Sequence, residues 1–208
     1  VHNVRGVNKL SYVFEVEPSR CQIAPRGHVY ATVSFSPLSM QNFSGLFEAT
    51  VDGPTLATTP TKNLSFEVSG EGHLPRVSVI RPATRNKQGQ PLFQFRKLLL
   101  GRQECHQLAL LNNGPLPCRV DLDLIDPDSC YSVIPAEDTE AVMNYDNNND
   151  DVRHPHTASL MIDIGKTATF TVKFVPNAVQ QNTANIKISI VNNQYEDTLI
   201  QLVGEGYQ

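Results

Sequence analysis

The sequence lacks the features of a membrane or secreted protein. No run approaches the roughly 18 uncharged apolar residues that a membrane helix needs, and the first residues, from Val1 to Arg5, contain no hydrophobic signal segment. The four cysteines, at positions 21, 105, 118 and 130, have no Cys-x-x-Cys spacing, which predicts buried free thiols in a reducing compartment. These absences predict a soluble, internal protein without a membrane span.

Motifs of common catalytic sites are also missing. The chain has no Gly-x-Ser-x-Gly elbow, no Gly-rich phosphate loop and no His-Glu-x-x-His. Cys105 and His106 are neighbours on an expected strand, so their side chains point to opposite faces. We therefore predict no enzymatic activity and no cofactor.

One short stretch resembles a metal site. Asp150, Asp151, His154 and His156 lie close together in sequence, and zinc accepts such ligands. The acid spacing that begins at Asp146 also resembles a calcium loop, but Asp151 stands where that loop requires glycine. No second ligand pair is apparent, and the stretch is typical of a polar loop, so we predict no metal.

Nucleic-acid binding is disfavoured as well. The net charge is −4, and the most basic stretch contains only two aromatic residues, Phe93 and Phe95. Their spacing directs both toward one face of a sheet, which does not make a base-stacking platform.

What the chain does contain is a repeated pair of motifs. Val29-Tyr-Ala-Thr-Val-Ser-Phe-Ser-Pro37 recurs as Ala168-Thr-Phe-Thr-Val-Lys-Phe-Val-Pro176, at an offset of 139 residues (37 to 176). Phe66-Glu-Val-Ser-Gly-Glu-Gly72 recurs as Ile200-Gln-Leu-Val-Gly-Glu-Gly206, at an offset of 134 (72 to 206). Repetition on this scale predicts two copies of one fold, with matching inward faces on the alternating strands.

Other offsets show where the copies differ. Phe14 matches Tyr131 at an offset of 117, so the second copy carries an insertion of about 22 residues (139 minus 117) between Pro135 and Leu160. Residues 1–13 correspond, with several residues deleted, to about 110–130, with Asn3 matching Asn112 only loosely, and the first copy has no counterpart of residues 77–108. We predict an incomplete domain at residues 1–72 and a complete one at 73–208, with an insertion at about 136–159.

The local pattern predicts strands throughout. Short alternating runs rich in Val, Ile, Phe and Thr end at Pro, Gly or Asn about every ten residues, as in β-sandwiches. The predicted fold class is all-β, with tandem Ig-like sandwiches of the major-sperm-protein or PapD-like kind. In the second copy, strands are expected near residues 77–80, 97–100, 106–111, 119–125, 131–134, 159–163, 167–175, 184–191 and 198–203.

Several of these motifs resemble the ASH family, Ig-like modules related to major sperm protein and found in cilia and centrosome proteins. The resemblance covers essentially the whole chain and is carried by Phe95-x-x-Leu98-x-Leu100-Gly101, Leu108-x-Leu110-x-Asn112-Asn113-Gly114-x-x-Pro117, Phe170-x-Val172-x-Phe174-x-Pro176 and Gly204-Glu205-Gly206. It implies a scaffold of the central pair in the axoneme of motile cilia. The implied partners are other central-pair proteins, tubulin and neighbouring modules of the same chain.

Charge is segregated within the second copy. Seven cations and no acid lie between Gly72 and Gln103, whereas ten acids and no Lys or Arg lie between Val120 and Val152. Complementary fields steer association, so these ends are candidate contacts, although such charges also keep strand edges from aggregating. The candidate basic face is Arg81, Arg85, Lys87, Arg96, Lys97 and Arg102, and the candidate acidic contact is Glu137, Asp138, Glu140, Asp150 and Asp151.

Two other functions stay open. A soluble adaptor of the major-sperm-protein type would recruit an acidic peptide or a membrane-contact partner, with Lys97 and Arg102 as candidate contacts. A secreted sandwich would suit the glycosylation sequons at Asn42 and Asn63, but about two sequons are expected by chance at this composition. The favoured prediction is a non-enzymatic ciliary scaffold acting through protein contacts.

Overall fold

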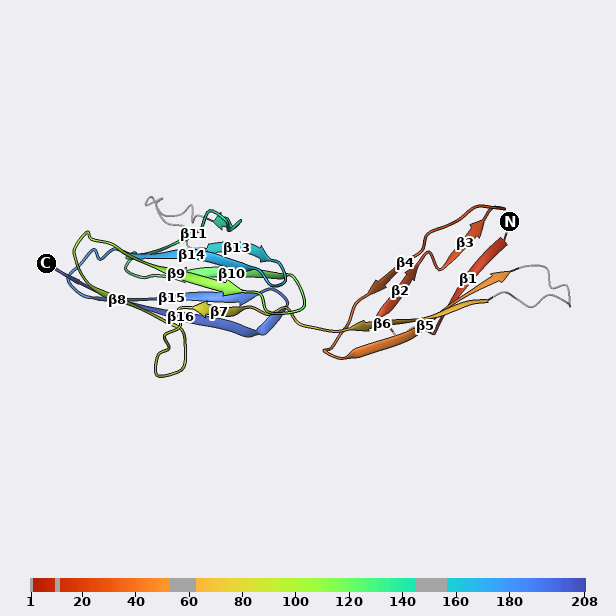
Figure 1. Cartoon of the computed structure of the whole chain (residues 1–208), viewed down its shortest axis with the longest axis horizontal. Coiled ribbons are helices and arrows are strands. Elements are labelled where there is room, and N and C mark those ends of the chain that lie inside the picture. The colour runs from red at the N-terminus through yellow and green to blue at the C-terminus, as the bar shows by residue number, and fades with distance from the viewer. Residues whose placement is uncertain (1, 10–11, 53–62, 145–156) are drawn as a thin grey trace. The chain divides into compact units, whose positions relative to one another are not determined.

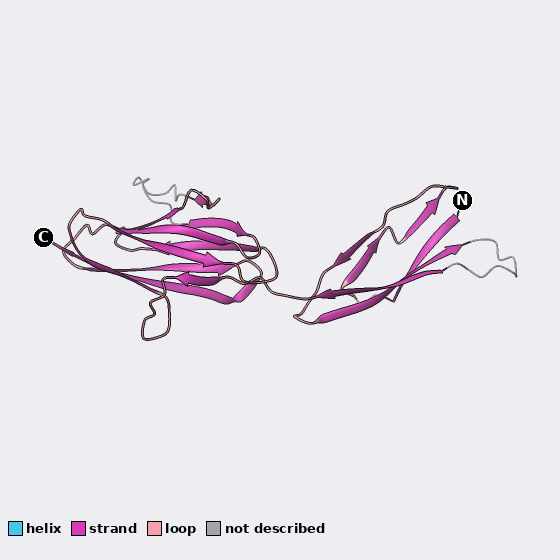
Figure 2. Cartoon of the chain, in the orientation of Figure 1, coloured by secondary structure: helices cyan, strands magenta, loops and turns pink. Residues whose placement is uncertain are grey.

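A computed structural model describes residues 2–9, 12–52, 63–144 and 157–208. The described chain consists of strands and loops, as Figure 2 shows. It divides into two compact units, Val1–His73 and Leu74–Gln208, which we call unit 1 and unit 2. The predicted all-β class with tandem Ig-like sandwiches is confirmed.

Unit 2 is a sandwich of two sheets (Figure 1). The six-stranded sheet has the order β12-β13-β10-β15-β16-β8, and the four-stranded sheet has the order β11-β14-β9-β7. The strands are β7 (Ser78–Arg81), β8 (Leu92–Leu99), β9 (Glu104–Leu111), β10 (Cys118–Ile125), β11 (Tyr131–Pro135), β12 (Val142–Asn144), β13 (Thr157–Ile162), β14 (Thr167–Phe174), β15 (Gln181–Ile190) and β16 (Asn193–Tyr207).

Alternation places the core of unit 2 between its sheets. Phe170, Val172 and Phe174 on β14 are fully buried, and they share one cluster with Ile186 of β15 and Ile200 of β16. Because successive strand residues point to opposite faces, each inward set occupies every second position. The inward face predicted from the repeat is therefore confirmed in unit 2.

Unit 1 contains two smaller sheets, in the orders β3-β1-β5-β6 and β2-β4. Its strands are β1 (His2–Lys9), β2 (Phe14–Glu17), β3 (Arg20–Ile23), β4 (Thr32–Phe35), β5 (Asn42–Asp52) and β6 (Asn63–Glu71). These orders match β13-β10-β15-β16 and β11-β14 of unit 2, strand for strand.

Pairing registers confirm the offsets read from the sequence. Phe47 pairs with Phe66 in unit 1, and Ile186 pairs with Ile200 in unit 2, as offsets of 139 and 134 require. Val16 likewise pairs with Val33 as Val133 pairs with Val172. The two units therefore share one register as well as one strand order.

One sequence match is wrong. Val4 pairs with both Cys21 and Val51, which are the counterparts of Leu160 and Ile190, the two partners of Val120. The first strand of unit 1 is thus equivalent to β10. The loose match of Asn3 with Asn112 fails, because Asn112 follows β9 in the other sheet.

Three further expectations need correction. The strand expected near 97–100 begins at Leu92, because Phe93 and Phe95 enter the core and the strand pairs parallel with β16. The apolar face of unit 1 is not buried, since Val29 and Val33 are 43% and 40% exposed. Among the thiols, all four are free, but Cys105 is exposed on β9 and only Cys118 and Cys130 are buried.

Candidate functional site

The basic face predicted from sequence follows two sheet edges of unit 2. Strand β7 ends the four-stranded sheet and carries Arg81, while β8 ends the six-stranded sheet and carries Arg96 and Lys97. Arg85 and Lys87 lie in the loop that connects β7 to β8, and Arg102 lies in the turn after β8. All six side chains belong to exposed residues.

Arg96 is held by a glutamate of the next strand. Its Nε lies 2.9 Å from Oε1 of Glu104, and its backbone N–H donates to Oε2 of the same carboxylate at 2.8 Å. Burial raises the pKa of the Glu104 carboxyl, but hydrogen bonds and charge from Arg96, with the charge of His106, more than offset burial. The pKa of Glu104 therefore lies below its usual value, which favours the charged pair.

Lys97 is paired in a similar way. Its Nζ lies 2.6 Å from Oε1 of Glu205, the residue directly opposite on β16. The ammonium also lies 5.9 Å from the ring centre of Tyr207. Both glutamates lie outside the basic stretch, so their pairing with Arg96 and Lys97 could not be predicted from that stretch.

Arg81 and Arg85 donate hydrogen bonds to uncharged acceptors and form no ion pair within the described residues. Arg81 donates from Nη1 to Oε1 of Gln107 at 2.6 Å, and Arg85 donates from Nη1 to the Pro82 carbonyl at 2.6 Å. Lys87 and Arg102 form no ion pair within the part of the chain that the structure describes. These two exposed cations are the ones most available to an acidic partner.

The described acidic residues lie near the opposite edge of the six-stranded sheet. Glu137, Asp138 and Glu140 are exposed in the segment before β12, the strand that pairs with β13 at that edge. Asp138 and Glu140 line a shallow depression together with Lys166. Asp150 and Asp151, with the rest of the metal-like stretch, lie outside the described residues.

Several other acids of this segment have local partners. Asp121 accepts a hydrogen bond from the Ser159 hydroxyl at 2.6 Å, and Asp126 accepts one from the Tyr131 backbone N–H at 2.6 Å. Asp128 accepts one from the Asn182 amide at 3.1 Å. Asp121 thus links two neighbouring strands, and Asp126 and Asp128 link a loop to strands, which reduces the acidic surface left for a partner.

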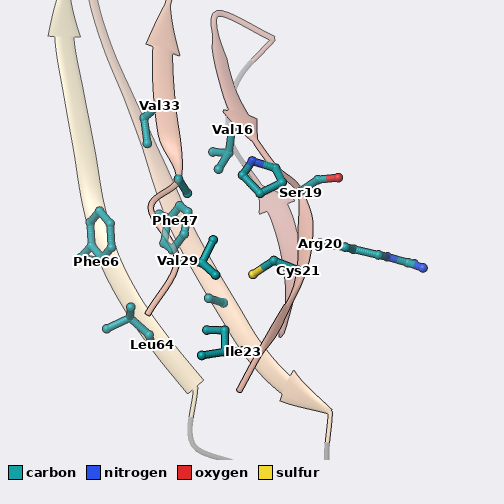
Figure 3. Close-up of a pocket in the computed structure, with 13 residues that line it drawn as sticks. Val16, Ser19, Arg20, Cys21, Ile23, Val29, Val33, Phe47, Leu64 and Phe66 are labelled. Carbon is teal, nitrogen blue, oxygen red and sulfur yellow. The ribbon is translucent and has the colours of Figure 1, made fainter. Parts of the chain in front are cut away.

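Unit 1 contains an apolar cavity that could not be predicted from the sequence (Figure 3). Its volume is about 270 Å³, and it lies between the strands of the two sheets. Cys21 points toward the apolar side chains, whereas Arg20 extends away from them. The lining includes Val16, Val29, Ala31, Val33, Phe47 and Phe66. Such a lining suits an apolar side chain better than a reacting substrate, because it offers few polar groups that could orient a substrate.

The described residues contain no group of three or more His, Cys, Asp or Glu arranged to hold a metal ion. Within the same residues, no helix is long and apolar enough to cross a membrane. The candidate functional surfaces of the described residues are the two charged edges of unit 2 and the cavity of unit 1.

Comparison with known proteins finds close relatives over nearly the whole chain. The chain is 42% identical over 206 residues to hydrocephalus-inducing protein of Mus musculus, and 43% identical over 198 residues to the hydrocephalus-inducing protein homolog of Homo sapiens. The alignments cover 98% and 94% of this chain. This chain is homologous to a segment of hydrocephalus-inducing protein. It spans only 4% of the length of each of these relatives.

No protein-family model matches the chain. Among solved structures, PapD-like domain 7 of human CEP192, described as an ASH / PapD-like domain, matches with a TM-score of 0.37 and 14% identity. That match covers 65% of this chain and 87% of the domain. Homology with hydrocephalus-inducing protein thus rests on the sequence alignments, and it covers both units.

Proposed function

We propose that this chain is a non-catalytic structural segment of a ciliary axoneme protein, located at the central pair and required for ciliary movement. The observation that carries the proposal is the 42–43% identity to hydrocephalus-inducing proteins along nearly the whole chain. The resemblance to the ASH family supports a ciliary location, because that family occurs in cilia and centrosome proteins. Contacts with other central-pair proteins, tubulin or neighbouring modules are the proposed mode of action.

The distribution of charge supports a contact role. Arg96 and Lys97 are paired with Glu104 and Glu205, whereas Lys87, in the loop before β8, and Arg102, in the turn after it, have no ion-pair partner among the described residues. Unpaired surface charges steer association and set orientation more than they add affinity. We therefore propose Lys87 and Arg102 as the main charged contacts, with Arg81 and Arg85 as further candidates.

A localisation experiment tests the proposal. The full-length protein carries a tag at its natural locus in motile ciliated cells, and its position is determined by immuno-electron microscopy. We expect label at the central pair of the axoneme. Label confined to the endoplasmic reticulum would favour the adaptor function instead, and label outside the cell would favour a secreted sandwich.

The contact surface is tested by charge reversal. Lys87→Glu with Arg102→Glu should weaken cosedimentation of the chain with axonemal microtubules by about tenfold at low salt, and the difference should shrink as salt rises. The matched control is Arg26→Glu with Lys173→Glu, which makes the same charge change at solvent-accessible positions outside both charged edges. Equal loss in both variants would indicate a nonspecific effect of net charge.

A further inference from the structure

Unit 1 exposes an apolar face that unit 2 buries. Val33 is 40% exposed although its counterpart Val172 is fully buried, and Phe66 is 45% exposed although Ile200 is fully buried. The strand orders and registers agree between the units, so the difference does not arise from a different fold of these strands.

Unit 2 shows what covers this face. There, β14 lies between β11 and β9, and β16 lies between β15 and β8. The covering strands bury Phe93 and Phe95 from β8 and Leu108 and Leu110 from β9. In the described part of unit 1, β4 pairs with β2 and β6 pairs with β5, so each has one edge left without a neighbouring strand.

The cavity of unit 1 lies along this uncovered face. Its 270 Å³ exceeds the roughly 150 Å³ of a dry protein cavity that accepts a benzene ring. Val29, Ala31 and Val33, on and just before β4, form one wall, and Phe47 and Phe66 of the larger sheet form another (Figure 3). In unit 2, the counterparts of the first three residues pair with β9 at Leu110, Leu108 and His106.

We propose that this groove receives an extended strand that pairs antiparallel with the free edge of β4. The strand carries alternating large apolar side chains, as β9 does, and it comes from another segment of the same long polypeptide. Two observations favour that source. In unit 2 the covering strands belong to the same chain, and the relatives of this chain extend far beyond the 4% of their length that it spans.

The register of the incoming strand follows from unit 2. Phe170 pairs with Leu108 and Ala168 pairs with Leu110, so large apolar residues of the incoming strand should stand opposite Ala31 and Val29. Directly opposite residues on paired strands share one face, so both side chains would enter the cavity. Main-chain hydrogen bonds would supply affinity, and the alternating side chains would supply specificity.

A labelled peptide provides the probe. It has the sequence of residues 102–113 with Cys105→Ser, and its fluorescence anisotropy is followed while the 208-residue chain is added. We expect saturable binding with one peptide per chain. A control peptide that also carries Leu108→Asn and Leu110→Asn should bind at least about tenfold more weakly, because it loses the burial of two apolar side chains.

Two neighbouring variants locate the site. Val33→Asp should weaken peptide binding by at least about tenfold because it puts a charge into the groove, whereas Ser34→Asp on the other face of β4 should leave binding unchanged. Both positions are exposed, so neither change removes a packed core group. No saturable binding, or equal effects of the two variants, would overturn the proposal.

The source of the strand is tested by occupancy. A longer piece of the natural polypeptide, extending beyond this sequence in both directions, should no longer bind the peptide, because its own strand fills the groove. Binding to both proteins would overturn the assigned source in favour of a separate partner. Dimers of the 208-residue chain that Val33→Asp disrupts would show that a second copy fills the groove instead.

Discussion

At the scale of single residues, the two repeated motifs pack against each other: glycines of the Gly-Glu-Gly motif contact the strand motif that ends in Phe-x-Pro. A Cβ placed on Gly204 would lie 2.5 Å from the Phe174 ring, and one placed on Gly206 would lie 2.3 Å from the Ala178 carbonyl oxygen. Unit 1 repeats the arrangement, since a Cβ on Gly70 would lie 2.7 Å from the Phe35 ring. The first glycine of Gly-Glu-Gly is therefore required for close approach of a ring, and the second for close approach of a backbone carbonyl.

The glycine contact gives the first prediction. Gly204→Ala should destabilise the protein by about 1–3 kcal/mol, because the added methyl group overpacks against Phe174. Chemical denaturation measures the change. In a Phe174→Leu background the same substitution should cost less, since the ring atoms that meet the methyl group are gone. Strictly additive costs in the two backgrounds would show that Phe174 is not the cause.

Cysteine reactivity gives a second residue-scale prediction. Cys105 is exposed, whereas burial, with a smaller effect from the charge of Glu196, raises the pKa of the Cys118 thiol to about 11. The thiolate is the reactive form, so iodoacetamide at neutral pH should label Cys105 well before Cys118. Mass analysis of peptides reports the order, and denatured protein labelled at all four cysteines is the control. Equal rates at both sites in folded protein would contradict the assigned burial.

At the scale of elements, β8 and β9 are joined by the Arg96–Glu104 pair, which should make stability depend on pH. The pKa of Glu104 is lowered on folding, so its contribution is complete above the unfolded value of about 4.3 and is lost as pH falls through the folded value. Glu104→Gln should therefore cost about 1 kcal/mol or less at neutral pH and almost nothing well below pH 4.

Denaturation of both proteins across this pH range measures the Glu104 effect. Arg96→Gln removes the cation instead of the acid. It should also weaken the dependence of stability on pH. If the difference between wild type and Glu104→Gln grew as the pH fell, the sign of the assigned shift would be wrong.

Equivalent strands of the two units should respond differently to the same truncation. Phe174→Ala on β14 should cost about 3–5 kcal/mol, because the ring is fully buried and stacks on Tyr131 at 4.8 Å. Phe35→Ala on β4 removes an equivalent stack, with Phe14 at 4.8 Å, but Phe35 is only partly buried. Its cost should be smaller, and equal losses in thermal unfolding would contradict the difference in burial.

At the scale of the whole molecule, the two units should differ in stability. Unit 2 buries a core cluster drawn from both of its sheets, whereas the buried cluster in the described part of unit 1 centres on Val13, Phe14 and Phe43. Hydrogen exchange should therefore show stronger protection in β10, β15 and β16 than in β1, β5 and β6. Equal protection in the two units would contradict the inference that unit 1 is less stable because it has the smaller core.

The sequence alone determined the all-β class, the repeat and the strand faces of both units. Alternation is local, so positions such as Phe170, Val172 and Phe174 reveal their common face without knowledge of any partner. Three residue offsets were enough to predict which strands are equivalent, and the observed registers agree with them. At β1 only the match of Asn3 with Asn112 failed, because that strand has no strong motif to anchor its register.

Only the tertiary structure decided the state of the candidate sites, because their properties depend on residues far apart in sequence. Lys97 meets Glu205 across 108 positions, and its neutralisation could not be read from a basic stretch. Exposure of Val33 depends in the same way on whether a strand lies beside β4, since alternation sets the direction of a side chain but not what covers it. Local patterns thus specified the two sandwiches, and distant contacts determined which of their surfaces are left for partners.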